Sequence, residues 1–297
     1  MRIAVTGNGG QVVRSLVERG MAAGHVVLPV GRPQLDLAAG DPDAVLRALD
    51  RAEPEAIVSA AAYTAVDKAE SEPDLAHAVN ATGAGHVARA AARLGVPLVH
   101  LSTDYVFAGD GTRAYREEDD TGPTGVYGAS KLAGEQAVLS TWNNSAVLRT
   151  AWVYSPFGAN FVKTMLRLAE SRDELGVVAD QWGNPTSALD IADGVLAVLD
   201  NLLGSTAPEL RGVFHMTGTG ATNWASFAAA IFAASAERGG PTARVKPITT
   251  ADYPTPARRP ANSRLDGGKL EQIHGVRLPE WQGATAAVVA RLLTADS

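Results

Sequence analysis

A short apolar strand that runs directly into a glycine-rich turn begins the chain, and this feature constrains the fold most. The strand-like run Met1–Thr6 is followed by the turn Gly7–Gly10 and then by a helix-like stretch, Arg14–Arg19. A dinucleotide-binding βαβ unit needs this order of strand, turn and helix. Gly7 permits the tight turn, and Gly10 lets the backbone approach a pyrophosphate at the helix N-terminus. The alternative is a strand-to-helix turn without a ligand.

The third glycine position of this turn pattern is occupied by Val13. Glycine there allows a helix to pack closely on the strand, whereas a β-branched side chain holds the two further apart. We therefore expect the first helix to be displaced.

Apolar strands alternate with alanine-rich helical stretches through the first half of the chain. Strand-like runs at Ala56–Ala60, Val96–Leu101 and Ala146–Arg149 alternate with helix-like stretches at Asp74–Leu94 and Gly128–Leu139. This rhythm predicts an α/β fold with a Rossmann-type, doubly wound parallel sheet.

The rhythm loosens after residue 152, where proline-bearing loops at 183–186 and 253–260 separate shorter elements. Such loops are typical of a smaller lobe that closes over a substrate. A chain of 297 residues also exceeds the size at which one core usually divides. We expect a dinucleotide-binding domain at 1–152 and a mainly substrate-binding C-terminal lobe at 153–297, with some segments returning to the first domain.

The composition excludes several kinds of partner. A net charge of −6 and a pI near 5.5 provide no basic surface for nucleic acid or an anionic membrane. No stretch approaches the ~20 apolar residues of a membrane span, and glycines interrupt the first apolar run too soon for a signal peptide. The chain has no cysteine, which suits a reducing cytoplasm. We expect a cytoplasmic protein that binds neither nucleic acid nor membrane.

Tyr127 and Lys131 lie four residues apart, downstream of a strand-like run that ends at Thr103. Residues four apart share a helix face, with Cβ atoms ~5–6 Å apart, so the ammonium is expected beside the phenol. A positive neighbour favours phenolate and draws the pKa of Tyr127 down from ~10. Thr103 is placed to offer its hydroxyl to the same substrate oxygen. The three residues predict an oxidoreductase site, although the four-residue spacing alone also occurs on solvated helices.

The end of the second strand indicates which cofactor is preferred. Where an acidic residue would bind a ribose 2′-hydroxyl, the chain has Gly31 and Arg32. Arg32 favours a 2′-phosphate, so we expect NADPH, with NADH possible; the alternative is a loop arginine in water. Asp36 and Leu37 follow and are expected near the adenine.

Six motifs together resemble one family. They are Gly7-x-x-Gly10-Gln11-Val12, Ala60–Glu70, Ser102–Phe107, Tyr127-x-x-x-Lys131-Leu-Ala-Gly-Glu135, Arg149–Tyr154 and Arg258–Asp266. From residue 1 to about Trp281 the chain resembles the dTDP-4-dehydrorhamnose reductases, which belong to the extended short-chain dehydrogenases/reductases. The resemblance implies NAD(P)H-dependent reduction of the C4 keto group of dTDP-4-dehydro-β-L-rhamnose to give dTDP-β-L-rhamnose.

The resemblance also implies a role for individual residues. Tyr127 would be the proton donor, and Lys131 would hold the nicotinamide ribose. Thr103 and Asp104 would contact the sugar, and Trp152 would lie against the substrate. Further candidate substrate contacts are Tyr105, Arg258, Arg259 and Asn262. The residues that line the cofactor would be Gly10, Gln11, Val12, Ala62, Tyr63 and Thr64, and Tyr127 is expected to contact the cofactor as well. Hydride delivery to C4 together with proton transfer from Tyr127 would leave no unpaired charge on the sugar oxygen.

Several of these assignments have alternatives. Trp152 is either a substrate contact or part of the core between the lobes. The charges within Asp67–Glu70 look like a solvated cluster on periodicity alone. Arg258 and Arg259 either clamp the nucleotide diphosphate bidentately or tie a proline-rich loop to an acidic neighbour. The six histidines show no metal-ligand spacing.

Position 15 departs from the family pattern. Members that dimerise around Mg²⁺ carry a glutamate there, whereas this chain has Ser15. Loss of a carboxylate removes a hard oxygen ligand and its charge. We therefore expect no metal, and either a monomer or a metal-free homodimer.

Two other functions stay open at this point. The same triad serves reductases of other dTDP-4-keto-6-deoxyhexoses, which differ in C4 stereochemistry. A related fold also serves as the non-catalytic regulatory partner of a methionine adenosyltransferase. The intact Thr103, Tyr127 and Lys131 argue against a silent binder, because binding alone does not need all three.

Overall fold

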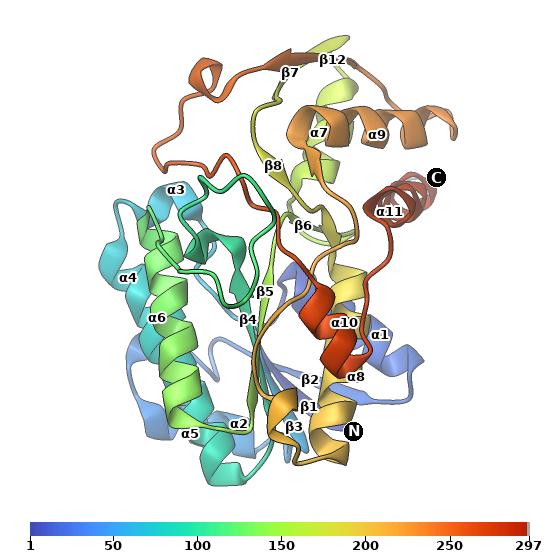
Figure 1. Cartoon of the computed structure of the whole chain (residues 1–297). Coiled ribbons are helices and arrows are strands. Elements are labelled where there is room, and N and C mark those ends of the chain that lie inside the picture. Colours follow the sequence, from blue (N-terminus) through green and yellow to red (C-terminus); the bar gives the residue numbers. More distant parts are fainter. Residues whose placement is uncertain (296–297) are drawn as a thin grey trace.

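A six-stranded parallel sheet with helices on both faces organises the computed structural model, which describes residues 1–295 (Figure 1). The strand order is β10-β5-β4-β3-β1-β2, and every neighbouring pair is parallel. The strands are β1 (Arg2–Thr6), β2 (Val26–Val30), β3 (Ala56–Ser59), β4 (Leu98–Thr103), β5 (Ser145–Thr150) and β10 (Gly212–His215). The predicted Rossmann-type, doubly wound α/β fold is confirmed.

Two helical layers cover the sheet. One face is packed by α1 (Gln11–Ala22), α8 (Ala188–Gly204) and α10 (Gly268–His274), and the other by α2 (Pro42–Asp50), α5 (Ala84–Leu94) and α6 (Val126–Thr141). Figure 1 shows α5 and α6 to the left of the sheet and α1 and α8 to its right. Because both faces are covered, β3, β4 and β5 are buried along their whole length. No helix in the described part of the chain is both long and apolar enough to cross a bilayer.

The segment between β3 and α5 is irregular. It contains the short helices α3 (Val66–Ala69) and α4 (Pro73–His77), followed by a π-helical turn at Ala78–Gly83. This segment lies beside α6, as the contacts of α4 and of the π-helical turn with α6 show.

Val13 is accommodated as a core residue beneath α1. Its side chain is 3% exposed and packs in the same cluster as Ile3, Leu16 and Val58. The displacement of α1 that this valine predicts stays a prediction.

A smaller group of elements lies beyond the carboxyl ends of the sheet strands, in the upper part of Figure 1. It comprises β6 (Val153–Tyr154), α7 (Phe161–Ala169), β7 (Glu174–Val178), β8 (Trp182–Gly183), β9 (Thr186–Ser187), β11 (Thr222–Asn223), α9 (Trp224–Ala236), β12 (Arg244–Ile248) and α11 (Trp281–Ala295). Its core is rich in aromatic side chains, including Tyr154, Phe227 and Trp281.

Parts of the second half of the chain lie in the sheet layer. β10 pairs with β5, and α8 packs along α1. The chain therefore crosses more than once, after β5, between the sheet with its helices and the smaller group of elements. The domain boundary at residue 152 stays a prediction.

Candidate active site

Thr103, Tyr127 and Lys131 meet at the carboxyl edge of the sheet. Thr103 ends β4, and the other two residues lie in the first two turns of α6. The phenol of Tyr127 lies beside the side chain of Thr103, close enough for that side chain to affect its pKa. Lys131 Nζ donates to the main-chain oxygen of Leu101, on the same strand, at 2.6 Å. The structure therefore brings these three predicted residues together.

Two glycines let α6 lie close to the rest of the site. A Cβ at Gly128 would lie 2.2 Å from the main-chain oxygen of Tyr105, and one at Gly134 would lie 2.1 Å from that of Asn80. Both oxygens belong to backbone, so no side chain can move aside. Only glycine at these two positions allows this approach of the helix that carries Tyr127.

The acidic C-cap residue of α3 caps the start of α6. Gly125, the N-cap residue, has no side chain to cap the helix, and the N–H of Val126 donates instead to Glu70 Oε1 at 2.9 Å. A carboxylate is favoured at a helix N-terminus. Glu70, which periodicity assigns to a solvated cluster, thus has a specific partner one residue from Tyr127.

Removal from water changes the acidity of Tyr127 and Lys131 in opposite directions. Burial raises the pKa of Tyr127 above its ordinary value, with the nearby Thr103 side chain acting against this. Burial lowers the pKa of Lys131 to about 8, with the Glu135 carboxylate acting against this. The prediction that Lys131 draws down the pKa of Tyr127 is wrong for this structure, because desolvation dominates and the ammonium donates to Leu101. A phenol that keeps its proton at neutral pH still meets the need of a proton donor.

Lys131 lies above a buried histidine that sequence reasoning did not single out. Nζ is 3.5 Å from His100 Nε2, and His100 Nδ1 is 3.0 Å from Ser59 Oγ. Burial holds the pKa of His100 well below its ordinary value. The imidazole is therefore neutral and adds no positive charge beneath the ammonium.

A pocket of about 440 Å³ opens beside the carboxyl ends of β1, β2 and β3. Its lining includes six predicted cofactor residues, namely Gly7, Arg32, Asp36, Leu37, Ala62 and Tyr63. The strand order reverses between β1 and β3, which is where open α/β sheets bind ligands. Gly7 forms the turn here with a φ of +104°, which a residue with a side chain rarely adopts.

The remaining predicted cofactor residues of the turn lie outside this pocket lining, as does Thr64. Gly10 is the N-cap of α1, so the amides that follow it have no partner within the helix. Val12 follows in the first turn and is half-buried. Gln11 uses its side chain to contact the segment after β6, since Oε1 accepts from Ser155 Oγ at 2.8 Å.

Arg32 and Asp36 differ in how their charges are used. Arg32 is exposed, and its guanidinium makes no hydrogen bond or ion pair with another residue of the described chain. Asp36 Oδ1 accepts from the N–H of Ala38 at 3.0 Å and so caps a short helical turn. The pocket thus has a guanidinium that is free to bind an anion.

Asp104 is buried with one carboxylate oxygen unpaired. Oδ1 accepts from Thr103 Oγ1 at 3.0 Å, whereas Oδ2 has no hydrogen-bond partner in the described structure. Burial raises the pKa of Asp104 to about 6, with the Ser263 and Thr103 hydroxyls acting against this. A buried polar atom without a partner requires an explanation, and a bound sugar hydroxyl would supply one.

Arg259 connects two segments above the site. Its Nη2 lies 2.5 Å from Asp67 Oδ2, and its Nη1 donates to the Tyr105 phenol at 3.1 Å. The Tyr105 ring in turn contacts the Tyr127 ring edge to face, with centroids 5.5 Å apart. For Arg259 this geometry favours the loop tie, and Arg258 is exposed without a partner among the described residues.

Asn262 is committed to loop structure. It is 4% exposed, its Nδ2 donates to the main-chain oxygen of Arg113 at 2.7 Å, and its Oδ1 accepts from Arg264 Nε at 2.7 Å. The amide therefore holds the 109–113 loop in place, and one N–H of its Nδ2 group remains for a ligand.

Trp152 packs against the core of the smaller group of elements and also against the buried cluster that contains Val106 and Ala151. It follows β5, whose last residue Thr150 pairs with Thr103. Its indole is half-buried and stacks on Trp224. This position is compatible with both alternatives, a substrate contact or a core residue.

Sequence reasoning gave no role to Asn80. It is 1% exposed, its Oδ1 accepts from the N–H of Tyr63 at 2.7 Å, and its Nδ2 donates to Ser130 Oγ at 3.0 Å. Asn80 therefore joins the loop at Tyr63, which lines the larger pocket, to α6. The only signal in the sequence is a single amide within a segment rich in alanine.

Glu135 and Arg149 form a buried, bidentate ion pair beneath the site. Arg149 donates through Nε to Glu135 Oε1 at 2.9 Å and through Nη2 to Oε2 at 2.7 Å, and Ser102 Oγ also donates to Oε1. Both residues belong to motifs that carry the resemblance, which did not assign them a role. The pair joins α6 to the ends of β4 and β5.

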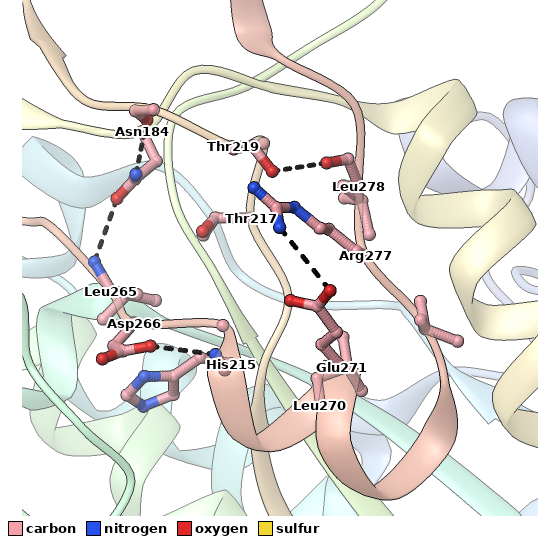
Figure 2. A pocket seen from close by; sticks show the side chains of 15 residues that line it. Asn184, His215, Thr217, Thr219, Leu265, Asp266, Leu270, Glu271, Arg277 and Leu278 are labelled. Carbon is pink, nitrogen blue, oxygen red and sulfur yellow. Dashed lines mark hydrogen bonds and ion pairs between the residues drawn. The ribbon is translucent and has the colours of Figure 1, made fainter.

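A second cavity, of about 270 Å³, lies at the carboxyl end of β10 beside α10 (Figure 2). None of the predicted site residues lines it. Figure 2 shows that polar groups around it bind one another: Asn184 contacts the N–H of Leu265, and Arg277 faces Glu271. These contacts hold the surrounding loops together.

Ser15, on α1, faces the interior of the protein. It is fully buried, and its hydroxyl donates to the main-chain oxygen of Gln11 at 2.9 Å. Among residues 1–295, no group of three or more His, Cys, Asp or Glu side chains is arranged to hold a metal ion. Independence from Mg²⁺ stays a prediction.

Known proteins resemble this chain along its whole length. The family described as "RmlD substrate binding domain" matches residues 1–294. A dTDP-4-dehydrorhamnose reductase of Sinorhizobium fredii is 53% identical over 294 residues, which cover 99% of this chain and 98% of the relative.

Solved structures agree in fold and in length. The dTDP-4-dehydrorhamnose reductase of Clostridium acetobutylicum superimposes with a TM-score of 0.90 at 36% identity, covering 99% of this chain and 100% of the other. That of Bacillus anthracis, solved in complex with NADP, gives 0.88 at 35% identity, covering 98% and 99%. The chain therefore belongs to the dTDP-4-dehydrorhamnose reductase family.

Proposed function

We propose that this protein catalyses the NADPH-dependent reduction of dTDP-4-dehydro-β-L-rhamnose at C4, giving dTDP-β-L-rhamnose. The observation that carries the proposal is the meeting of Thr103, Tyr127 and Lys131 at the carboxyl edge of the sheet. The membership of the family and the NADP bound by the Bacillus anthracis relative support the same reaction.

The residues of the larger pocket fit a phosphorylated dinucleotide. Its volume of about 440 Å³ adjoins the turn that opens α1, where unpaired amides and the helix dipole favour an anion. The free guanidinium of Arg32 would hold a 2′-phosphate. Lys131 has three ammonium hydrogens and two neighbours within hydrogen-bond distance, Leu101 O and His100 Nε2, so a donor is left for a ribose hydroxyl.

The proton chemistry follows from the two shifted pKa values. NADPH, when bound, supplies the hydride that reduces C4. Tyr127 holds its proton because burial raises its pKa, and it donates that proton to the C4 oxygen as negative charge develops there. Thr103 orients the same oxygen through its hydroxyl. Lys131, while its ammonium is protonated, would hold the nicotinamide ribose next to this phenol.

The pH dependence of kcat/KM is expected to have an alkaline limb near pH 8. Lys131 has a folded-state pKa lowered to about 8, so its ammonium loses a proton, and its charge, as the pH rises through that value. The measurement is kcat/KM from about pH 6 to about pH 10, because its pH dependence reports the pKa values of the essential groups in the free enzyme. Lys131→Arg keeps a positive charge beyond this range, so its limb should move to higher pH even if its rate is lower. An identical limb in both proteins would assign it to another group.

Cofactor preference is expected to shift when Arg32 is replaced by an acidic residue. Arg32→Asp should weaken NADPH more than NADH, because a carboxylate repels a 2′-phosphate and accepts a hydrogen bond from a 2′-hydroxyl. The measurement is the ratio of kcat/KM for the two cofactors. Arg172→Asp makes the same charge change at an exposed position outside the pocket and serves as the control. If both variants move the ratio equally, Arg32 acts only through net charge.

The proposed reaction is tested by following NADPH absorbance with enzymatically generated dTDP-4-keto-6-deoxysugar, with and without the 3,5-epimerase, and by identifying the product by NMR. Turnover that needs the epimerase, with a rhamnose product, is the expected result. A product of the other C4 configuration would place the protein among the reductases of other deoxysugars. Cofactor binding without turnover would favour a silent binding subunit.

The oligomeric state and the compartment stay predictions from the sequence, as a monomer or metal-free homodimer in the cytoplasm. The division into a cofactor domain and a substrate lobe near residue 152 is likewise part of the proposal, as are the individual substrate contacts.

A further inference from the structure

The backbone of Trp152 is held in an unfavourable conformation. Its φ is +48°, and Glu53 is the other non-glycine residue with positive φ that the structure describes. Bulky side chains rarely adopt this left-handed region, and such residues persist only where their surroundings fix them. The main-chain oxygen of Trp152 accepts from the N–H of Thr186 at 3.1 Å, which helps to hold the conformation.

Trp224 covers one face of the Trp152 indole. The ring centroids are 3.6 Å apart and the planes differ by 10°. Trp224 is itself fixed, because it begins α9 and its Nε1 donates to Gln181 Oε1 at 3.2 Å. Gln181 in turn donates to Thr250 Oγ1 at 3.1 Å. The stack therefore belongs to a connected set of contacts in the second lobe.

Gly183 borders the edge of the same indole. A Cβ at this position would lie 2.4 Å from Cε2 and 2.6 Å from Nε1 of Trp152. Any side chain at position 183 would force the indole to shift. Trp152 is thus fixed by its own backbone, by a stacked ring on one face and by a glycine at one edge, while part of it remains exposed.

We infer that Trp224 and Gly183 are positioning residues that fix the indole of Trp152 against the sugar of the nucleotide-sugar substrate. The inference rests on the proposed function, in which Trp152 contacts the substrate. The location of Trp152 supports this inference, because it comes shortly after Thr150, the β5 residue that pairs with Thr103. A flat indole held at one angle suits an apolar face of a deoxysugar ring. Trp224 and Gly183 act on the substrate only through Trp152.

The test compares steady-state kinetics of Trp224→Leu, Trp224→Phe and Gly183→Ala with those of the wild type. An interaction made equally in the ground state and the transition state changes KM and leaves kcat. We expect Trp224→Leu and Gly183→Ala to raise KM for the dTDP-sugar about tenfold with kcat nearly unchanged. Trp224→Phe keeps a stacked ring and should restore most of the affinity. The Kd for NADPH should not change in any of them, which shows that each variant is folded.

A matched control is Trp281→Leu, which removes an indole from the same core without touching the Trp152 ring. It should not change KM. The double variant Trp152→Ala/Trp224→Leu gives the decisive comparison, because a residue that acts through Trp152 has no further effect once Trp152 is gone. An undiminished effect of Trp224→Leu in that background, or equal KM changes in the Trp281 control, would overturn the inference and leave the proposed function intact. A wild-type protein that does not reduce the dTDP-sugar would overturn both.

Discussion

Replacement of Tyr127 by phenylalanine is expected to lower kcat about 10²–10⁴-fold, the usual contribution of a positioned acid. The change removes the phenolic proton and keeps the ring, so the edge-to-face contact with Tyr105 can persist. Affinity for NADPH should change little, since the lost group acts on the sugar oxygen. The measurement is kcat from NADPH oxidation with saturating dTDP-4-dehydrorhamnose, together with a separate Kd for the cofactor.

The matched control for this variant is Tyr253→Phe. Tyr253 is 62% exposed, so the same loss of a hydroxyl should have no effect on turnover. Near-normal kcat in Tyr127→Phe would mean that another group, or water, protonates the sugar oxygen. Equal losses of kcat and of NADPH affinity would point instead to a role in cofactor binding.

The elements that position Tyr127 were largely predictable, because the relevant signals are local. Strands β3, β4 and β5 are short apolar runs bounded by turn residues, and they are buried on both faces as such runs predict. The glycine turn begins at Gly7, directly after the last residue of β1. Tyr127 and Lys131 share a helix face because of their spacing alone.

The acidity of Tyr127 was not predictable in the same way. The spacing of Tyr127 and Lys131 indicates a charge effect between them, but its size depends on how much water surrounds each group and on what else each group binds. Desolvation raises the pKa of the phenol, and Leu101 accepts from the ammonium. Neither burial nor a main-chain acceptor is visible in a pattern of residue types.

Contacts between distant segments were also beyond the sequence. The charges within Asp67–Glu70 have the periodicity of a solvated face, yet Asp67 binds Arg259 and Glu70 caps α6. Gln11, expected beside the cofactor, uses its side chain to bind Ser155 and Asn160. The residue type of a polar side chain indicates which groups it can bind. Its actual partner depends on which distant segments the fold brings beside it.

The buried ion pair between Glu135 and Arg149 is the place where a single substitution should most affect stability. Their side chains are 3% and 4% exposed, and Glu135 also accepts from Ser102. Breaking such a pair leaves a charge buried without a counter-charge, which typically costs 3–5 kcal/mol, so Glu135→Leu should lower the free energy of unfolding by about 3–5 kcal/mol. Arg149→Met should have a similar cost. The measurement is urea-induced unfolding, with the slope m compared among variants to check that the transition is unchanged in kind.

The double variant Glu135→Leu/Arg149→Met distinguishes the loss of a charge partner from the loss of packing. Replacing a whole buried pair by apolar residues of similar volume is often neutral or stabilising, so the double variant should recover most of what either single change costs. The half-exposed pair Arg19–Asp193 provides the control, because breaking a surface pair costs about 1 kcal/mol or less. Two results would show that the pair does not hold α6 to β4 and β5 by charge. One is a loss of unfolding free energy in Glu135→Leu as small as that in Arg19→Met, and the other is a double variant as unstable as the two single variants combined.

In the expected case the pair fixes the relative positions of Thr103, on β4, and of Tyr127 and Lys131, on α6. The kcat of the double variant should therefore remain below that of the wild type even where its stability returns.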